Sequence, residues 1–221
     1  MTDLRVLAWN VHGYRAGHTR VGEVIAEQGP DVVLLNEAGY LRFRARRLGS
    51  RLGMRVVSGG GFRTRIPNAV LIRPPWRLVE YRVEVLPRAG RELRRGAVLA
   101  TIGRAGRRIL AAAVHLGLSR RERVRHAEVL TDLLVTHRHP VILGGDLNEG
   151  PDGPAASWMA ARFWDAQAGD AGALTFPSAD PRARIDYVFV SDGLTVERAW
   201  IAADADSSDH LAVVADLRLE D

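Results

Sequence analysis

Short apolar runs recur along the chain and predict buried β-strands. Polar or glycine-containing turns separate them, and a region at residues 78–114 holds further strand-like segments with turns at Gly90 and Gly106. Because the runs are rich in Val, Leu and Ile rather than strictly alternating, many of these strands are expected to be buried on both faces. The clearest runs cover residues 4–9, 31–35, 68–72, 109–114, 141–143, 185–191 and 211–215.

Apolar residues at helical spacing predict helices between some of these strands. Residues 41–52 form an amphipathic pattern whose outer face is basic. Ser119 and Glu122 match a capping box, which predicts a helix that continues to about His137. Further helices are expected at residues 21–28 and 155–163.

The chain shows no internal repeat, linker or low-complexity segment, so residues 1–221 are expected to form a single domain. At this length a sizeable core can be buried. Strands outnumber helices in the pattern. The sequence therefore predicts an α/β fold in which two sheets pack face to face and helices lie outside them.

Polar side chains follow several of the apolar runs at the point where the strand ends. In residues 141–150 the run passes through Gly144 and Gly145 and then presents Asp146 and Asn148. Residues two apart on an extended segment point the same way, so these two side chains are expected to address one object. Candidate ligands or catalytic groups at the other strand ends are Asn10, Glu37, His115, Asp186, Asp209 and His210.

The order of these motifs resembles the endonuclease/exonuclease/phosphatase superfamily, the deoxyribonuclease-I-like metal-dependent phosphoesterases. The matching pieces are W-N-V-H-G, N-E-A, V-H-L, G-G-D-L-N, R-I-D-Y-V-F-V-S and S-S-D-H, which together span most of the chain. The resemblance implies a four-layer sandwich with two central mixed β-sheets and helices on the outside. It also implies hydrolysis of a phosphate ester with Mg2+ or Mn2+.

Hard divalent cations prefer oxygen ligands, and the resemblance points to Asn10, Glu37 and Asp209 as the metal-binding residues. Spacing alone would also allow Asn10 to be a turn residue before Gly13. For Glu37 the alternative is a solvated carboxylate at a helix start.

The resemblance assigns catalytic roles to the remaining positions. Asp186 would orient the imidazole of His210. Beyond what the resemblance implies, we expect Asp146, aided by Asn148, to align the attacking water, while a protonated His210 and His115 donate to phosphoryl oxygens. Whether His210 or Asp146 takes the proton of the water stays open.

The composition narrows the partners and the location. The formal net charge is +5 and all 31 basic residues are arginine, which suits phosphate oxygens but also fits codon bias. No apolar run is long enough for a membrane span, the first strand leaves no room for a signal peptide, and a cytoplasmic location is expected.

These observations favour a phosphodiesterase or nuclease that attacks a phosphate ester in line with an activated water. The basic surface favours nucleic acid as the substrate. A phospholipid or inositol-phosphate phosphoesterase is the alternative, followed by a non-catalytic relative that binds polyanions. The segment at residues 174–181 is short and poor in aromatic residues, which argues against an abasic-site endonuclease.

Overall fold

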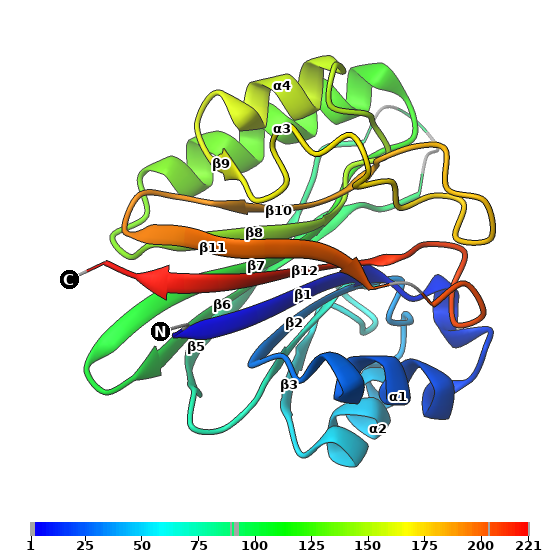
Figure 1. Ribbon diagram of the computed structural model, residues 1–221, viewed down its shortest axis with the longest axis vertical. Helices are drawn as coiled ribbons and strands as arrows, with labels where there is room; N and C mark the ends of the chain where they lie inside the picture. Colours follow the sequence, from blue (N-terminus) through cyan, green and yellow to red (C-terminus); the bar gives the residue numbers. More distant parts are fainter. Residues whose placement is uncertain (1–2, 89, 91–92, 203, 221) are drawn as a thin grey trace.

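The computed structural model describes residues 3–88, 90, 93–202 and 204–220, and within them the strands form two six-stranded sheets (Figure 1). In each sheet one neighbouring pair is parallel, β1 with β2 and β7 with β8, and the other pairs are antiparallel. The first sheet has the order β11 (Leu194–Ala202), β12 (Ala212–Leu219), β1 (Leu4–Asn10), β2 (Val32–Asn36), β4 (Ala69–Ile72) and β3 (Arg55–Ser58). The second has the order β5 (Arg77–Val85), β6 (Gly96–Arg104), β7 (Arg107–His115), β8 (Val141–Asp146), β10 (Asp186–Val190) and β9 (Trp164–Asp165).

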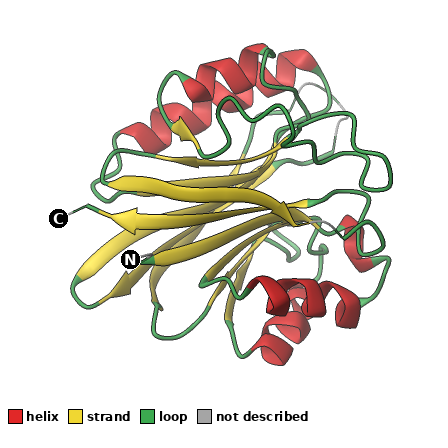
Figure 2. Cartoon of the chain, in the orientation of Figure 1, coloured by secondary structure: helices red, strands yellow, loops and turns green. Residues whose placement is uncertain are grey.

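Helices cover the outer face of each sheet, so the molecule has four layers (Figure 2). Helices α1 (His18–Gln28) and α2 (Arg42–Leu52) lie against the first sheet, and a 3-10 turn, η1 (His12–Tyr14), precedes α1. Helices α3 (Arg120–Val135) and α4 (Pro154–Ala160) lie against the second. The arrangement confirms the fold predicted from the sequence.

The strands are apolar on both faces because each face packs against another layer. On β1, Val6 and Ala8 point into the core between the two sheets, whereas Leu7 and Trp9 pack toward α1 and α2. This two-residue alternation is the ordinary geometry of a strand. A strand that is covered on both faces, such as β1, therefore requires a continuous apolar run.

Three strands lacked a prediction from the sequence. Strands β3, β9 and β11 are short or lie at sheet edges, and β11 carries half-buried and exposed residues along most of its length. Edge strands need no continuous apolar run, so the pattern that identified the inner strands does not mark them. The helix predicted at residues 155–163 is shorter and ends at Ala160.

The parallel pairs decide where the polar strand ends meet. Strands β1, β2, β7 and β8 all end at the same edge of the sandwich, where β10 begins and the loop into β12 returns. No helix in the described part of the chain is long and apolar enough to cross a membrane.

Candidate active site

The polar strand ends come together at this edge because of the sheet registers. Asn10 pairs with Asn36 across β1 and β2, and His115 pairs with Asp146 across β7 and β8. Asp186 pairs with Asp146 from the other side, at the start of β10. The backbone registers therefore bring these strand ends to one edge of the sandwich.

Asp146 is the centre of the cluster, and its carboxylate is buried. Its Oδ2 accepts a hydrogen bond from Asn10 Nδ2 at 3.0 Å and lies 3.2 Å from His115 Nε2. Its Oδ1 accepts the backbone N–H of Asn148 at 2.7 Å. Burial acts to raise the pKa of Asp146, but the interactions with His115, His210 and the Asn148 N–H outweigh it and hold that pKa below its usual range.

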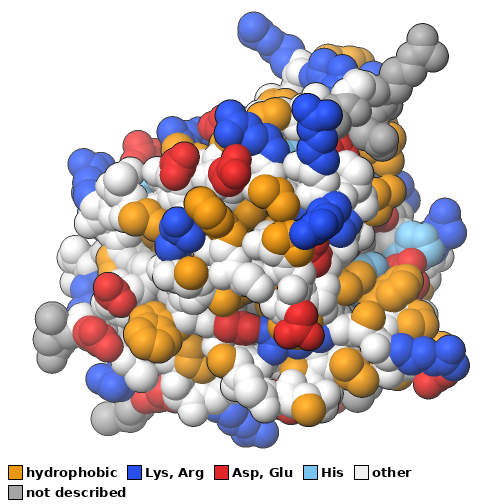
Figure 3. Space-filling model, turned by 90° about the horizontal axis from the view of Figure 1, so that it is seen from above, with side chains coloured by type: hydrophobic (Ala, Val, Ile, Leu, Met, Phe, Trp, Pro, Cys, Tyr) orange, Lys and Arg blue, Asp and Glu red, His pale blue; other side chains and the backbone are white. Residues whose placement is uncertain are grey.

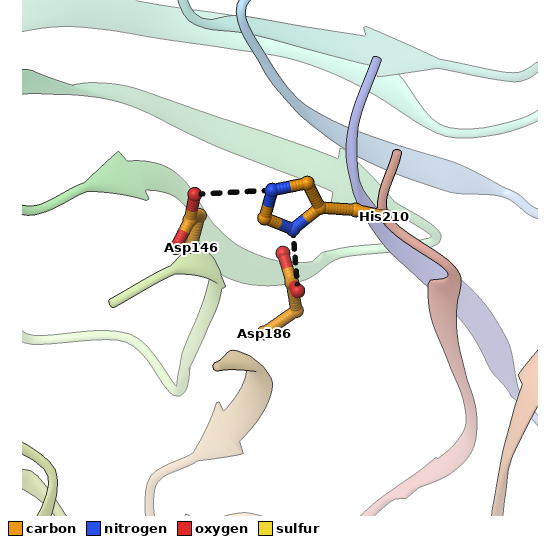
Figure 4. Close-up of side chains that lie close together, drawn as sticks. All are labelled: Asp146, Asp186 and His210. Carbon is orange, nitrogen blue, oxygen red and sulfur yellow. Dashed lines mark hydrogen bonds and ion pairs between the residues drawn. The ribbon is translucent and has the colours of Figure 1, made fainter. Parts of the chain in front are cut away.

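His210 lies between two carboxylates (Figure 4). Its Nδ1 is 2.8 Å from Asp186 Oδ2, and its Nε2 is 3.9 Å from Asp146 Oδ2. Burial acts to lower the pKa of His210, but the hydrogen bond and charge of Asp186, with Asp146 behind, raise it to about 9. The imidazole is therefore charged at neutral pH.

Packing fixes the His210 ring from two directions. Trp9 Nε1 donates to the His210 carbonyl at 2.8 Å, and the ring of Phe176 lies 4.8 Å from the imidazole, centre to centre. Asp186 is held in turn by Thr175, whose hydroxyl accepts the Asp186 backbone N–H at 3.3 Å. An orienting residue with so little freedom keeps the imidazole in a single position.

The glycine pair of β8 permits the close approach of the two sheets at this point. A Cβ on Gly145 would lie 2.0 Å from the Val114 carbonyl and 2.6 Å from Asn36 Oδ1, and Gly145 has a φ of 139°. Asn36 uses the space left free. Its Oδ1 accepts the Asp146 backbone N–H at 2.9 Å and its Nδ2 donates to the Val114 carbonyl at 2.7 Å, which joins the two sheets beside the site.

The two-residue spacing predicted that Asp146 and Asn148 share one face of an extended segment. The structure does not show this arrangement. Strand β8 ends at Asp146, and Asn148 has a φ of 53°, in the left-handed region. Its side-chain Nδ2 donates to the Leu116 carbonyl at 3.1 Å. The backbone turns because the Asn148 N–H bonds to the Asp146 carboxylate, so Asn148 serves Asp146 through its main chain.

Of the three residues expected to bind metal, Asn10 belongs to this cluster, and Glu37 and Asp209 lie on loops that follow Asn36 and precede His210. Asn10 ends β1, and Glu37 follows Asn36 directly at the end of β2 with a φ of 52°. Asp209 is partly exposed and its Oδ1 is 3.2 Å from His12 Nδ1. The Ser208 hydroxyl links two of the segments, since it donates to the Asn10 carbonyl at 2.6 Å.

The donor set fits a hard divalent cation. All three side chains offer oxygen, which is what Mg2+ and Mn2+ prefer. Within the described residues the Glu37 carboxylate has no hydrogen-bond or ion-pair partner, so a charged oxygen group at this edge is left free for a ligand.

A second set of ligand atoms, from Asp146, Asp186 and His210, lies within 4.8 Å of one another. Two of these residues are already engaged, because His210 Nδ1 and Asp186 Oδ2 form a hydrogen bond of 2.8 Å. That bond leaves His210 Nε2 and Asp186 Oδ1 outside it, and Asp186 Oδ1 has no hydrogen-bond partner among the described residues. The geometry of this set is that of a hydrogen-bonded relay, and the oxygen-only set suits a metal better.

Several residues of the site were not singled out from the sequence. Asn36 was seen only as the neighbour of Glu37, and Thr175 and Ser208 only as parts of motifs. Arg95 lies in a basic run that looks like a solvated surface, yet the residue is buried and its Nη1 is 2.9 Å from His115 Nδ1. Only the pairing of β6 with β7 reveals its position.

An α/β sandwich of two sheets, with polar residues at the edge where β1, β2, β7 and β8 end, is the fold class of the deoxyribonuclease-I-like proteins. A sequence model of the endonuclease/exonuclease/phosphatase family matches residues 7–210. The chain belongs to this family, as the resemblance predicted. A comparison with curated proteins finds no match.

Solved structures show the same fold. An endonuclease/exonuclease/phosphatase from Beutenbergia cavernae DSM 12333 is similar with a TM-score of 0.77 and 26% identity, covering 99% of this chain and 72% of that one. The mannosyl-6-phosphatase of Bacteroides thetaiotaomicron VPI-5482 is similar with a TM-score of 0.84 and 18% identity, covering 98% of this chain and 100% of that one. The catalytic domain of human nocturnin, with bound sulfate, is similar with a TM-score of 0.78 and 21% identity, covering 98% of this chain and 94% of that one.

Proposed function

We propose that the protein is a divalent-metal-dependent phosphodiesterase that acts on nucleic acid by in-line attack of a water molecule. The observation that supports this most is the convergence on Asp146. Side chains from β1, β7 and the loop before β12 point at one buried carboxylate oxygen, at 3.0, 3.2 and 3.9 Å. Family membership supplies the class of reaction, hydrolysis of a phosphate ester.

In this proposal Asp146 accepts a hydrogen bond from the attacking water and aligns it with the phosphorus atom. Its unusually acidic carboxyl stays ionised, and Asn148 and Asn10 hold its two oxygens in place. An ionised, immobile carboxylate is a good acceptor for that purpose. Asp146 is preferred to His210 as the residue that aligns the water, because His210 is already protonated at neutral pH.

His210 and His115 would donate hydrogen bonds to phosphoryl oxygens, where negative charge grows during attack. Asp186 holds His210 in the charged and oriented form. Removal of one such donor typically costs about 10²–10³ in rate.

Asn10, Glu37 and Asp209 would hold the Mg2+ or Mn2+ ion, which supplies charge neutralisation at the phosphate and stabilises the leaving oxygen. The free carboxylate of Glu37 supports this role. Asn10 connects the two halves of the site, because its Nδ2 also bonds to Asp146.

The surface beside Glu37 supports a polyanionic substrate. Residues 38–79 contain ten arginines and no aspartate, glutamate or lysine. Within the described residues, none of the arginines on α2 forms an ion pair with a carboxylate. The face over α3 and α4 differs, since acidic and basic side chains are interspersed there (Figure 3). The ten are Arg42, Arg44, Arg46, Arg47, Arg51, Arg55, Arg63, Arg65, Arg73 and Arg77.

Aromatic side chains stand among these arginines. Phe62 is 96% exposed, Phe43 is 63% exposed and Tyr40 is 45% exposed. Phe43 is on α2, and the loops that carry Tyr40 and Phe62 are joined, because Gly61 donates its N–H to the Tyr40 carbonyl at 2.9 Å and Ala38 donates to the Pro67 carbonyl at 2.6 Å. Exposed rings between guanidinium groups suit the unpaired bases and phosphates of a single strand.

A direct test is hydrolysis of single-stranded DNA, RNA and plasmid DNA with Mg2+ or Mn2+, with and without a chelator. We expect cleavage that stops with chelator and in Asp146→Asn. Binding without turnover of any phosphoester would instead identify a non-catalytic polyanion-binding relative.

The role of the basic surface has a matched test. The double variant Arg46→Gln/Arg47→Gln on α2 should raise KM for a single strand about fivefold or more and lower its dependence on salt. The double variant Arg120→Gln/Arg121→Gln removes the same charge from the exposed side of α3 and should change neither. Equal effects of the two pairs would mean that only net charge matters.

The same surface gives a specific reason to consider a second function. Leu41, Phe43 and Phe62 are exposed apolar groups flanked by arginine, a combination that also suits the surface of an anionic membrane. The second candidate is therefore a phospholipid or inositol-phosphate phosphoesterase. Hydrolysis of phospholipid in anionic vesicles, without cleavage of polynucleotides, would favour it over the nuclease.

A further inference from the structure

Arg95 and His115 form a buried contact next to the site that the proposed mechanism does not use. Arg95 Nη1 lies 2.9 Å from His115 Nδ1. The Arg95 residue is 8% exposed and His115 is 2% exposed. The guanidinium group of Arg95 therefore lies against the imidazole of His115 in a buried position.

The contact settles which ring nitrogen carries the proton. Arginine has N–H donors and no acceptor, and it stays protonated in proteins. The Nδ1 of His115 must therefore be the acceptor and bear no hydrogen. A ring protonated on both nitrogens would set N–H against N–H at 2.9 Å, so the contact selects the neutral ring with its single proton on Nε2.

The remaining proton points at the reacting region. His115 Nε2 is 3.2 Å from Asp146 Oδ2. Because Nε2 carries the hydrogen, this contact is a hydrogen bond that Nε2 donates. The three residues thus form a chain in which Arg95 donates to His115 and His115 donates to Asp146.

The fold builds this chain with little freedom. Gly96, which begins β6, pairs with His115 at the end of β7, so Arg95 lies one residue beyond that pair. A Cβ on Gly96 would lie 2.3 Å from the Glu84 carbonyl, which keeps the strand close to β5. The Arg95 carbonyl accepts the Leu86 N–H at 3.0 Å and anchors the residue.

We propose that Arg95 is a positioning residue that holds His115 in the neutral, Nε2-protonated form. The consequence for the reaction rests on the proposed function: the single Nε2–H of His115 is donated to Asp146 without substrate and to a phosphoryl oxygen when substrate is bound, and His115 does not transfer its proton. This differs from His210, whose Nδ1 faces a carboxylate. The two imidazoles therefore act as one neutral and one charged donor.

The decisive measurement is the long-range nitrogen–proton NMR spectrum of the His115 ring, assigned with His115→Gln. At neutral pH and without added metal, we expect an unprotonated Nδ1 and a protonated Nε2. A proton on Nδ1, or on both nitrogens, would overturn the proposal. The spectrum needs no substrate, so the proposal can be judged even if the chain hydrolyses no phosphoester, a result that would count against the proposed function alone.

Variants at Arg95 test the consequence for turnover. Arg95→Met should lower kcat by about 10–100-fold while KM changes by less than about threefold. Arg94→Met is the matched control, because Arg94 is the adjacent arginine, is exposed and donates to the Arg63 carbonyl on the surface. Its kcat and its His115 ring spectrum should equal those of the wild type.

Rescue separates positioning from a general loss of structure. Guanidinium ion added to Arg95→Ala should restore part of the lost kcat and the wild-type ring spectrum, and Arg95→Lys should keep more activity than Arg95→Met. If Arg95→Met does not fold, Arg95→Lys and the wild-type spectrum still decide. A folded Arg95→Met with an unchanged ring spectrum and unchanged kcat would refute the role.

Discussion

His115 and His210 flank the same carboxylate oxygen, and their far nitrogens face opposite charges. The two Nε2 atoms lie 3.2 and 3.9 Å from Asp146 Oδ2. The Nδ1 of His115 faces Arg95 at 2.9 Å, whereas that of His210 faces Asp186 at 2.8 Å. Similar residues thus acquire different protonation states from their neighbours, as general electrostatics requires.

The contact between Asp186 and His210 predicts that Asp186→Asn has a large effect on kcat. The variant keeps the shape of the side chain but removes the charge and the acceptor that orient His210. We expect kcat to fall by about 10²–10⁴-fold with a small change in KM. The pKa of His210 should also fall from about 9, because the hydrogen bond and charge of Asp186 are what raise it.

Steady-state kinetics and an NMR titration of the His210 ring measure the two effects. Asp192→Asn is the control, since it makes the same chemical change at an exposed position after β10. A normal kcat in Asp186→Asn would show that His210 needs no orienting partner.

The proximity of Asp146 and Asp186 follows from features that the sequence contains. Asp186 and Asp146 sit at the ends of apolar runs, and buried parallel or antiparallel strands bring such ends to a common edge. The identity of the layers followed in the same way from runs that are apolar on both faces. These features depend on local pattern, which a single sequence contains.

Other features depend on contacts between distant segments and were not predictable. Arg95 resembles its exposed neighbour Arg94 in the sequence, and only the register of β6 with β7 buries one and leaves the other at the surface. The turn at Asn148 depends on the Asp146 carboxylate, so the extended geometry assumed from spacing was wrong.

The proposed metal site predicts how activity should depend on cation concentration. Glu37→Gln removes the charge of the free carboxylate but keeps its size. We expect the Mg2+ or Mn2+ concentration for half-maximal activity to rise by about tenfold or more, with part of kcat recovered at saturating cation.

A cation titration of activity measures this shift, and Glu27→Gln on the exposed side of α1 is the control. Binding of Mn2+ followed by paramagnetic relaxation gives a second readout that needs no substrate. An unchanged titration curve in Glu37→Gln would place the cation elsewhere.

A buried histidine away from the site predicts a pH dependence of stability. His126 on α3 accepts the Gly117 N–H at its Nδ1, 3.2 Å away, and its Nε2 lies 2.7 Å from the Pro87 carbonyl. Burial lowers the pKa of His126 below 6.5, although Pro87 and Glu122 act to raise it.

His126 takes up a proton more readily in the unfolded chain than in the folded protein. Its contribution to the free energy of unfolding is therefore complete above pH 6.5 and is lost as the pH falls through the folded-state pKa. The free energy of unfolding in urea should therefore drop between pH 7.5 and 5.5 by more in the wild type than in His126→Gln. The difference between the two proteins removes the contributions of the other histidines. A difference that does not change with pH would contradict the prediction.

We expect a large loss of stability from a methyl group added at Gly145. At Gly145→Ala the new Cβ would lie 2.0 Å from the Val114 carbonyl, at a φ of 139° that L-residues rarely adopt. Relief requires β7 and β8 to move apart beside the Asn36 side chain, so we expect a loss of about 2–4 kcal/mol in the free energy of unfolding. Gly150→Ala, where nothing lies within 4 Å, should cost less than about 1 kcal/mol. Chemical denaturation of both variants measures the contrast, and equal stabilities would mean that the close contact between β7 and β8 relaxes freely.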